Sequence, residues 1–196
     1  MSQPPHPHGA GKSSFDLIDP DTLFASLHLK PGDAVLDLGC GEGRYSLPLA
    51  RRLGPAGQVF AVDLWPEGLA ILKDKAREGG LGNLRTLLAD VSQPLPLPDG
   101  SVDLALLATV LHDLTEAGQA EGALTELARL VKPGGRLAVL EFKKIQGPPG
   151  PPLAIRLSPG EVAALLLPYG FTPGKITDLG PHIYMVMFAR STPSQN

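Results

Sequence analysis

The sequence predicts an α/β fold: a doubly wound, mostly parallel seven-stranded sheet with an antiparallel last strand and helices on both faces. Short apolar runs, typical of buried strands, alternate along the chain with segments of helical periodicity. Clusters of Gly and Pro end most of these segments. The connections are short, so each crossover must return to the same sheet with the same hand.

The first half of the chain repeats one order of helix, turn and strand. Asp19 can cap the first helix, because Pro20 then occupies its first turn. Gly and Pro residues mark the turns between the later elements. Helices are expected over residues 20–29, 43–53 and 66–78, and strands over residues 34–38, 58–62 and 84–89.

The second half continues this order and then changes. A strand over residues 102–108, a helix over 115–131 and a strand over 136–142 complete the parallel part. A Pro-rich loop and a helix over 158–169 follow. Gly180-Pro181 joins the last two apolar runs, 176–179 and 183–189, closely enough for a hairpin, so the last strand should run antiparallel.

The length of 196 residues fits one domain with its own core. We expect a flexible amino-terminal segment and possible lid over residues 1–19, a single domain over 20–190 and a tail over 191–196. Segment 13–19 and the Pro-rich loop could cover a pocket and order when a ligand binds.

Composition limits the function classes. The formal charge of −3 offers no excess of positive charge, so no nucleic-acid partner is expected. Cys40 is the only cysteine, which excludes an internal disulfide and a cysteine-cluster zinc site; no metal is expected. No apolar run reaches the length of a membrane span and no signal peptide is visible, so we expect a cytoplasmic monomer or homodimer.

Three glycines, Gly39, Gly41 and Gly43, follow the strand over 34–38 where a helix begins. Backbone without side chains can approach a ligand there, and the start of a helix favours negative charge. The dinucleotide pattern G-x-G-x-x-G would need glycine where Arg44 stands. A nicotinamide-dependent oxidoreductase is therefore a weaker alternative.

Two carboxylates end the next strands. Asp63 follows the second strand, about 20 residues past the loop, where it can accept both hydroxyl hydrogens of an adenosine ribose. Asp90 follows the third strand and can accept from an adenine amino group while the Val91 amide faces the ring. Loop and acids meet at the carboxyl edge of the sheet, where open α/β sheets bind ligands.

The sequence resembles a family, the class I S-adenosylmethionine-dependent methyltransferases, which have a Rossmann-like fold. The matching blocks, in the family's order, are VLDLGCGEG, VFAVDLWPE, LLADVSQPLPLPDGSVDLALLATVLHDL and LVKPGGRLAVLEF. The motif pattern is nearest to the quinone-biosynthesis-like small-molecule methyltransferases. The segment after the fifth strand departs from the quinone-biosynthesis enzymes, since a compact KKIQGPPGPPLAIRLSP replaces their longer insertion.

The resemblance implies an enzyme that binds S-adenosyl-L-methionine, releases S-adenosyl-L-homocysteine and methylates a small organic acceptor at a carbon, oxygen or nitrogen atom. It implies that the glycines surround the methionine part of the cofactor and that Leu64 packs on adenine. Asp37 and the Ala108 carbonyl would hold the ammonium, Asp63 the ribose, and Asp90 with Val91 the edge of adenine. A regulatory protein that binds the cofactor without turnover is the alternative.

His112 follows the fourth strand and is the candidate general base; its alternative role is to pack the connecting loop. His182 and Tyr184 should return to the same edge. Lys143 and Lys144 are interpreted as solvated. Arg156 could pair with an anionic substrate, but an exposed arginine is the simpler expectation.

Overall fold

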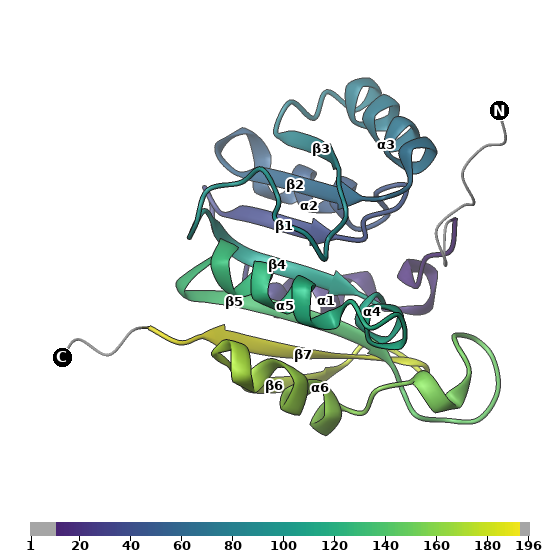
Figure 1. Ribbon diagram of the computed structural model, residues 1–196. Helices are drawn as coiled ribbons and strands as arrows, with labels where there is room; N and C mark the ends of the chain where they lie inside the picture. Colours follow the sequence, from purple (N-terminus) through teal and green to yellow (C-terminus); the bar gives the residue numbers. More distant parts are fainter. Residues whose placement is uncertain (1–10, 193–196) are drawn as a thin grey trace, which may run out of the picture.

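The computed structural model describes residues 11–192 (Figure 1). Its seven-stranded sheet has the order β3-β2-β1-β4-β5-β7-β6. Most of the predicted segment 1–19, and all but residues 191 and 192 of the predicted tail, lie outside the described residues. The strands are β1 (Ala34–Leu38), β2 (Gln58–Asp63), β3 (Leu84–Leu88), β4 (Val102–Ala108), β5 (Val131–Phe142), β6 (Phe171–Asp178) and β7 (Ile183–Arg190).

The strand directions confirm the predicted fold. β3, β2, β1, β4 and β5 pair in parallel, whereas β7 runs antiparallel to both of its neighbours, β5 and β6. The carboxyl ends of β1 and β4 therefore meet at one edge, together with the amino end of β7 (Figure 1).

Helices cover both faces of the sheet. Side chains of α1 (Pro20–Leu27) and α2 (Ser46–Leu53) pack on one face, and α3 (Pro66–Glu78) adds a smaller cluster there. Side chains of α4 (Leu111–Glu116), α5 (Ala120–Leu130) and α6 (Pro159–Leu166) pack on the other face, toward the viewer in Figure 1. The 3-10 turns are η1 (Phe15–Leu17), η2 (Gly54–Ala56), η3 (Leu153–Ile155) and η4 (Leu167–Tyr169).

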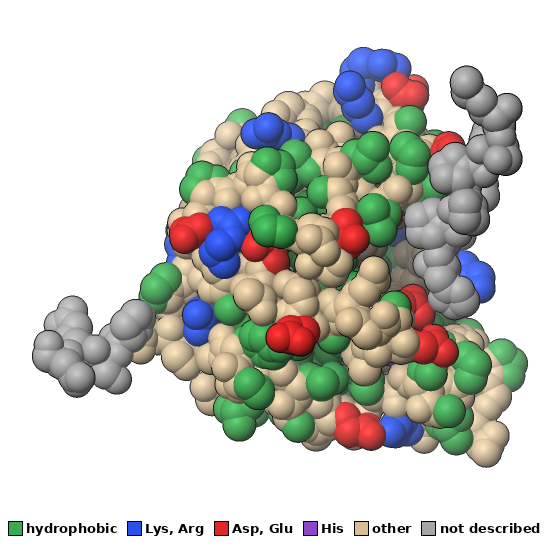
Figure 2. Space-filling model, in the orientation of Figure 1, with side chains coloured by type: hydrophobic (Ala, Val, Ile, Leu, Met, Phe, Trp, Pro, Cys, Tyr) green, Lys and Arg blue, Asp and Glu red, His purple; other side chains and the backbone are tan. Residues whose placement is uncertain are grey.

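The central strands follow the apolar runs because both of their faces are covered. β1 and β4 are buried almost throughout, with their side chains alternating between the two core clusters. On the face shown in Figure 2, acidic and basic side chains are interspersed.

Several predicted boundaries are wrong. The helix expected over 115–131 is two helices, α4 and α5, because the left-handed Gly118 (φ +68°) breaks the chain between them. β5 begins at Val131, five residues earlier than expected, and its register with β4 shifts between Val102 and Leu104. β6 begins at Phe171 because its irregular pairing with β7 tolerates Pro173.

Candidate functional site

The glycine loop after β1 is held against the end of β2. The Val62 carbonyl accepts hydrogen bonds from the amides of both Gly39 (2.8 Å) and Cys40 (3.1 Å). All three glycines have positive φ: +73° at Gly39, +52° at Gly41 and +80° at Gly43. The loop therefore turns back on itself before α2 begins.

The glycines differ in their surroundings. A Cβ at Gly39 would lie 2.6 Å from a methyl of Val110, and one at Gly43 would lie 2.1 Å from a methyl of Leu72. At Gly41 no atom lies within 4 Å of that position. Gly39 and Gly43 are therefore required by packing, whereas Gly41 leaves open space where a ligand can approach the backbone.

Asp63 links the loop to the end of β2. Its Oδ2 accepts from the Gly41 amide at 2.7 Å, and its Oδ1 accepts from the Trp65 amide at 2.8 Å. Each carboxylate oxygen has a second lone pair that can accept a ligand hydroxyl. Leu64, the next residue, is 47% exposed although it is a large apolar side chain.

Asp37 lies beneath the loop with 1% of its surface exposed. The Ser46 hydroxyl donates to its Oδ2 at 2.5 Å, which fixes the first turn of α2 to β1. Burial raises the pKa of Asp37 to about 7; the Ser46 hydrogen bond opposes this rise, and the nearby charge of Asp63 adds to it.

The remaining predicted cofactor residues lie at the same edge. Asp90 Oδ1 accepts from both the amide and the hydroxyl of Ser92, at 2.8 and 2.7 Å. Val91 is buried in the core cluster below. The Ala108 carbonyl, at the end of β4, accepts from the Thr109 hydroxyl at 2.7 Å.

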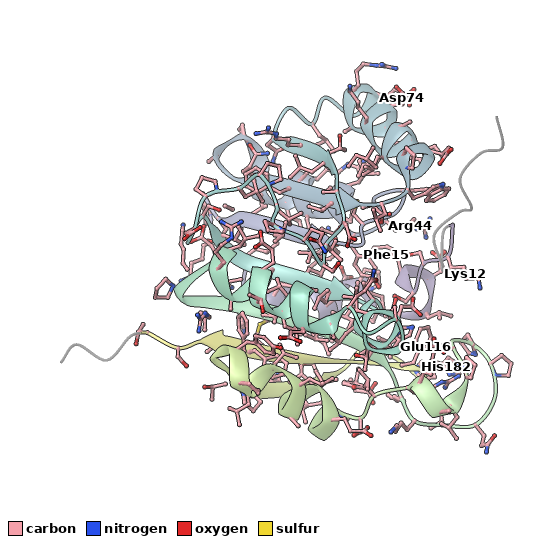
Figure 3. All side chains as sticks on the ribbon, viewed as in Figure 1. Lys12, Phe15, Arg44, Asp74, Glu116 and His182 are labelled. Atoms are coloured by element: carbon pink, nitrogen blue, oxygen red, sulfur yellow. The ribbon has the colours of Figure 1, made fainter. Side chains whose placement is uncertain are left out.

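The start of the described chain is fastened to this edge. The buried Ser14 hydroxyl is hydrogen-bonded to the Tyr45 hydroxyl (2.8 Å) and to the Thr109 hydroxyl (3.1 Å). The Phe15 ring meets the Tyr45 ring edge-on, and the Arg44 guanidinium lies 5.4 Å from the centroid of the Phe15 ring (Figure 3). Thr109 is left-handed (φ +58°), a costly conformation for a β-branched residue and one enriched at functional sites.

His112, at the start of α4, forms a buried pair with Glu141 of β5. The ring Nδ1 lies 2.7 Å from Glu141 Oε2, and the backbone amide of His112 donates to Oε1 at 3.1 Å. The contact with Glu141 favours the neutral tautomer that donates from Nδ1 and keeps a lone pair on Nε2, whereas the protonated ring donates from both nitrogens. His112 Nε2 lies 3.5 Å from Asp113 Oδ1.

The electrostatics of His112 follow from these neighbours. Burial disfavours the charged ring, but the hydrogen bond and charge of Glu141, with the charges of Asp113 and Glu116, outweigh burial and raise the pKa of His112. The site therefore holds a histidine with its orientation fixed and its basicity increased.

Three of the other candidates from the sequence, Lys143, Lys144 and Tyr184, have structural partners. Lys143 is partly buried, and its ammonium binds Asp178 and the Gly180 carbonyl, whereas Lys144 pairs with Glu161 at the surface. The Tyr184 hydroxyl donates to the Leu157 carbonyl at 2.6 Å. His182 lies at the carboxyl edge (Figure 3), and its buried Nδ1 has no hydrogen-bond partner among the described residues.

Arg156 corrects the sequence interpretation. It is 2% exposed, not solvated, and its guanidinium donates only to backbone carbonyls of the preceding loop. It has no donor left for an anionic substrate, because all five N–H groups are used.

Sequence reasoning missed Glu141, Ser14 and Thr109. The signal for Glu141 was visible: one acid ends the apolar run of the fifth strand, beside the strand that leads to His112. Nothing in the sequence indicated the contacts of Ser14 and Thr109, which join residues 95 positions apart.

Among residues 11–192 no group of three or more His, Cys, Asp or Glu side chains could hold a metal ion. No helix in this part of the chain is long and apolar enough to cross a membrane. The site is thus a glycine loop, acids at two strand ends and a His–Glu pair, all at one sheet edge.

Comparison with known proteins identifies the class that this fold and site define. The model of a methyltransferase domain family matches residues 35–135. A SAM-dependent methyltransferase from Aquifex aeolicus is 32% identical and superposes with a TM-score of 0.81 over 90% of this chain and 92% of that one. A SAM-dependent methyltransferase from Methanosarcina mazei, 22% identical with a TM-score of 0.69, covers 89% of this chain and 98% of that one and shares the fold.

Curated relatives include the ubiquinone/menaquinone biosynthesis C-methyltransferase UbiE of Ectopseudomonas mendocina (strain ymp). It is 34% identical over 158 residues, which make up 74% of this chain and 58% of that protein. UbiE of Burkholderia mallei (strain SAVP1) is 33% identical over 69% of this chain and 58% of its own length. This chain thus spans a little over half the length of these relatives.

The chain therefore belongs to the S-adenosylmethionine-dependent methyltransferases, near the quinone-biosynthesis type. The predicted class, fold and cofactor are confirmed, and the nicotinamide-dependent oxidoreductase is set aside.

Proposed function

We propose that this enzyme methylates a ring carbon of a small hydroxylated aromatic acceptor of the quinol type, with His112 as the general base. The observation that carries the proposal is the buried His112–Glu141 pair at the carboxyl edge, with its 2.7 Å contact. The UbiE relatives, which are C-methyltransferases of ubiquinone and menaquinone biosynthesis, support the choice of carbon and of a quinol.

The cofactor half of the site fits S-adenosylmethionine. The open position at Gly41 can admit the methionine part, and Asp63 has lone pairs free for ribose hydroxyls. The exposed Leu64 offers an apolar surface to adenine, with Asp90 and Val91 at its edge. Asp37 and the Ala108 carbonyl are the proposed partners of the ammonium group.

When bound, S-adenosylmethionine supplies an electrophilic methyl group on a sulfonium that departs as a neutral thioether. The protein's part is to align the acceptor and to raise its nucleophilicity. A quinol ring carbon becomes strongly nucleophilic when a neighbouring hydroxyl loses its proton, and the Nε2 lone pair of His112 can take that proton. Glu141 stabilises the imidazolium through Nδ1–H. As the ring carbon bonds to the methyl group, the sulfonium–methyl bond breaks. The methylated carbon then releases its own hydrogen as a proton to solvent, and the ring oxygen takes its proton back from His112, which restores the aromatic quinol.

The test combines binding and turnover. Calorimetric titration with S-adenosylhomocysteine measures the cofactor site alone, and incubation with S-adenosylmethionine and a reduced naphthoquinone measures transfer. We expect binding by wild type and by His112→Gln, and a loss of about 100-fold in turnover for His112→Gln. His28→Gln, which changes an exposed histidine at the end of α1, is the matched control and should leave both quantities unchanged.

Two results would contradict the proposal. Turnover by His112→Gln equal to that of wild type would contradict the assignment of His112 as the general base. A methyl group found on oxygen rather than on carbon would contradict the proposed acceptor atom but not the assignment of the cofactor site.

A further inference from the structure

The loop that connects β5 to η3 (residues 143–152) has few hydrogen bonds of its own. Four of its residues are prolines, which have no amide hydrogen, and the loop runs past the carboxyl end of β5 (Figure 1). Only the Ile145 amide donates within the loop, to the Lys143 carbonyl at 2.8 Å. Such a segment would ordinarily be mobile.

Arg156 organises this loop from inside. Its Nε donates to the carbonyl of Pro151 at 2.9 Å, and Nη1 donates to those of Lys143 (3.1 Å) and Ile145 (2.9 Å). Nη2 donates to the carbonyls of Gly147 (2.8 Å) and Pro149 (2.9 Å). The acceptors are every second residue of the loop, so the chain curls around the cation.

Every hydrogen-bond donor of the Arg156 guanidinium is used. A guanidinium has five N–H groups, and all five point to loop carbonyls. Lysine has the same charge but only three donors from a single atom, so it could not reproduce this arrangement. The loop conformation therefore depends on the shape of the arginine head group and not only on its charge.

The same loop packs on the residue next to the His–Glu pair. A Cβ at Gly150 (φ +104°) would lie 2.5 Å from the Phe142 ring, and the Arg156 guanidinium lies 5.7 Å from the centroid of that ring. Phe142 meets His112 edge-on with centroids 6.1 Å apart. Phe142 also follows Glu141 directly. Arg156 thus holds the loop, the loop packs on Phe142, and Phe142 packs on His112.

We propose that Arg156 is a specificity-determining positioning residue, which holds the loop 143–152 as a preformed wall of the acceptor pocket beside Phe142 and His112. The wall selects acceptors by shape before any ligand binds, so the loop is not a lid that orders upon binding. This inference rests on the proposed function, because it places the acceptor next to His112.

The first test needs no turnover. Hydrogen–deuterium exchange of the free enzyme should show the hydrogen-bonded amides of Ile145, Ile155 and Arg156 protected in wild type. They should exchange about tenfold faster in Arg156→Lys, while residues 35–46 stay unchanged. Gln146→Ala, an exposed residue of the same loop, is the control and should match wild type. A loop that is unprotected in wild type until S-adenosylhomocysteine and 1,4-naphthoquinone are added would overturn the preformed wall.

The second test separates positioning from folding. With S-adenosylmethionine and reduced 1,4-naphthoquinone, Arg156→Lys should raise the KM for the quinol about tenfold, with kcat lowered less than threefold and the Kd of S-adenosylhomocysteine unchanged. Gly150→Ala, which disturbs the same wall from the loop side, should act in the same direction. An unchanged KM in both variants would overturn the proposal. Weaker binding of S-adenosylhomocysteine alongside the higher KM would also overturn it, because it would indicate a general structural role for Arg156.

The two proposals fail differently. If wild type binds S-adenosylhomocysteine but methylates no quinol, the proposed acceptor is wrong, and the exchange experiment still decides whether Arg156 holds a preformed wall. If the acceptor is methylated but Arg156→Lys behaves as wild type in both tests, the wall is wrong and the proposed function stands.

Discussion

One carboxylate, that of Glu141, binds His112 twice: Oε1 accepts from the backbone amide and Oε2 from the ring Nδ1. The side chain of Glu141 has no exposed surface, and that of His112 is 5% exposed. The pair therefore fixes both where α4 begins and how the imidazole is turned, and it connects the ends of β4 and β5.

Glu141→Gln should lower kcat about 100-fold, because an amide has one acceptor oxygen for two donors and does not stabilise the imidazolium. The unfolding free energy should fall by about 1–3 kcal/mol, since a buried donor loses its partner. Steady-state kinetics and urea unfolding measure the two effects. Binding of S-adenosylhomocysteine should be unchanged; a variant with normal kcat would exclude Glu141 from the reaction.

Asp113→Asn should move the pH dependence of kcat to lower pH. The neutral ring is the active base, so activity rises with pH through the raised pKa of His112, and removing the Asp113 charge lowers that pKa. The shift should be small, because Asp113 is partly solvated. Asp74→Asn, on the exposed side of α3, is the control. A shift to higher pH would contradict the assignment of His112 as base.

Asp37 should release a proton when the cofactor binds. Its pKa of about 7 in the free protein means that it is largely protonated below neutral pH, and a ligand ammonium favours the ionised form. Affinity for S-adenosylhomocysteine should therefore weaken as pH falls below about 7. Calorimetry at pH ~6.5 in two buffers of different ionisation enthalpy measures the release. Equal apparent binding enthalpies of wild type in the two buffers would show that Asp37 releases no proton when the ligand binds. In Asp37→Asn the difference between the two buffers should disappear.

Gly41→Ala and Gly43→Ala form a matched pair, since both residues are left-handed and lie in one loop. The Cβ at position 43 would meet Leu72 at 2.1 Å, so Gly43→Ala should lose at least about 2 kcal/mol of unfolding free energy. Gly41→Ala should lose only about 1 kcal/mol for its backbone conformation, but its affinity for S-adenosylhomocysteine should fall about tenfold. Normal affinity in Gly41→Ala would mean that this backbone does not face the cofactor.

The sequence predicted the strands of the parallel sheet well because burial on both faces makes their apolar runs continuous. The placement of the glycine loop, Asp63 and Asp90 at one edge was also predictable, since parallel strands bring their carboxyl ends together. The hairpin turn Gly180-Pro181 predicted the antiparallel β7.

A helix break at a single glycine, and contacts between residues distant in the sequence, were not predictable. The division between α4 and α5 depends on one left-handed glycine, Gly118, within a helical pattern. Arg156 was interpreted as exposed because its five partners are backbone carbonyls, which carry no sequence signal. The hydroxyl cluster of Ser14, Tyr45 and Thr109 likewise depends on where the folded chain brings three ordinary residues together.

The most direct test of the proposed function uses S-adenosylmethionine with a 13C-labelled methyl group and a reduced naphthoquinone, followed by NMR of the product. We expect a labelled methyl on a ring carbon, formed by wild type and about 100-fold more slowly by His112→Gln. Label on oxygen, or equal rates in the two proteins, would contradict it.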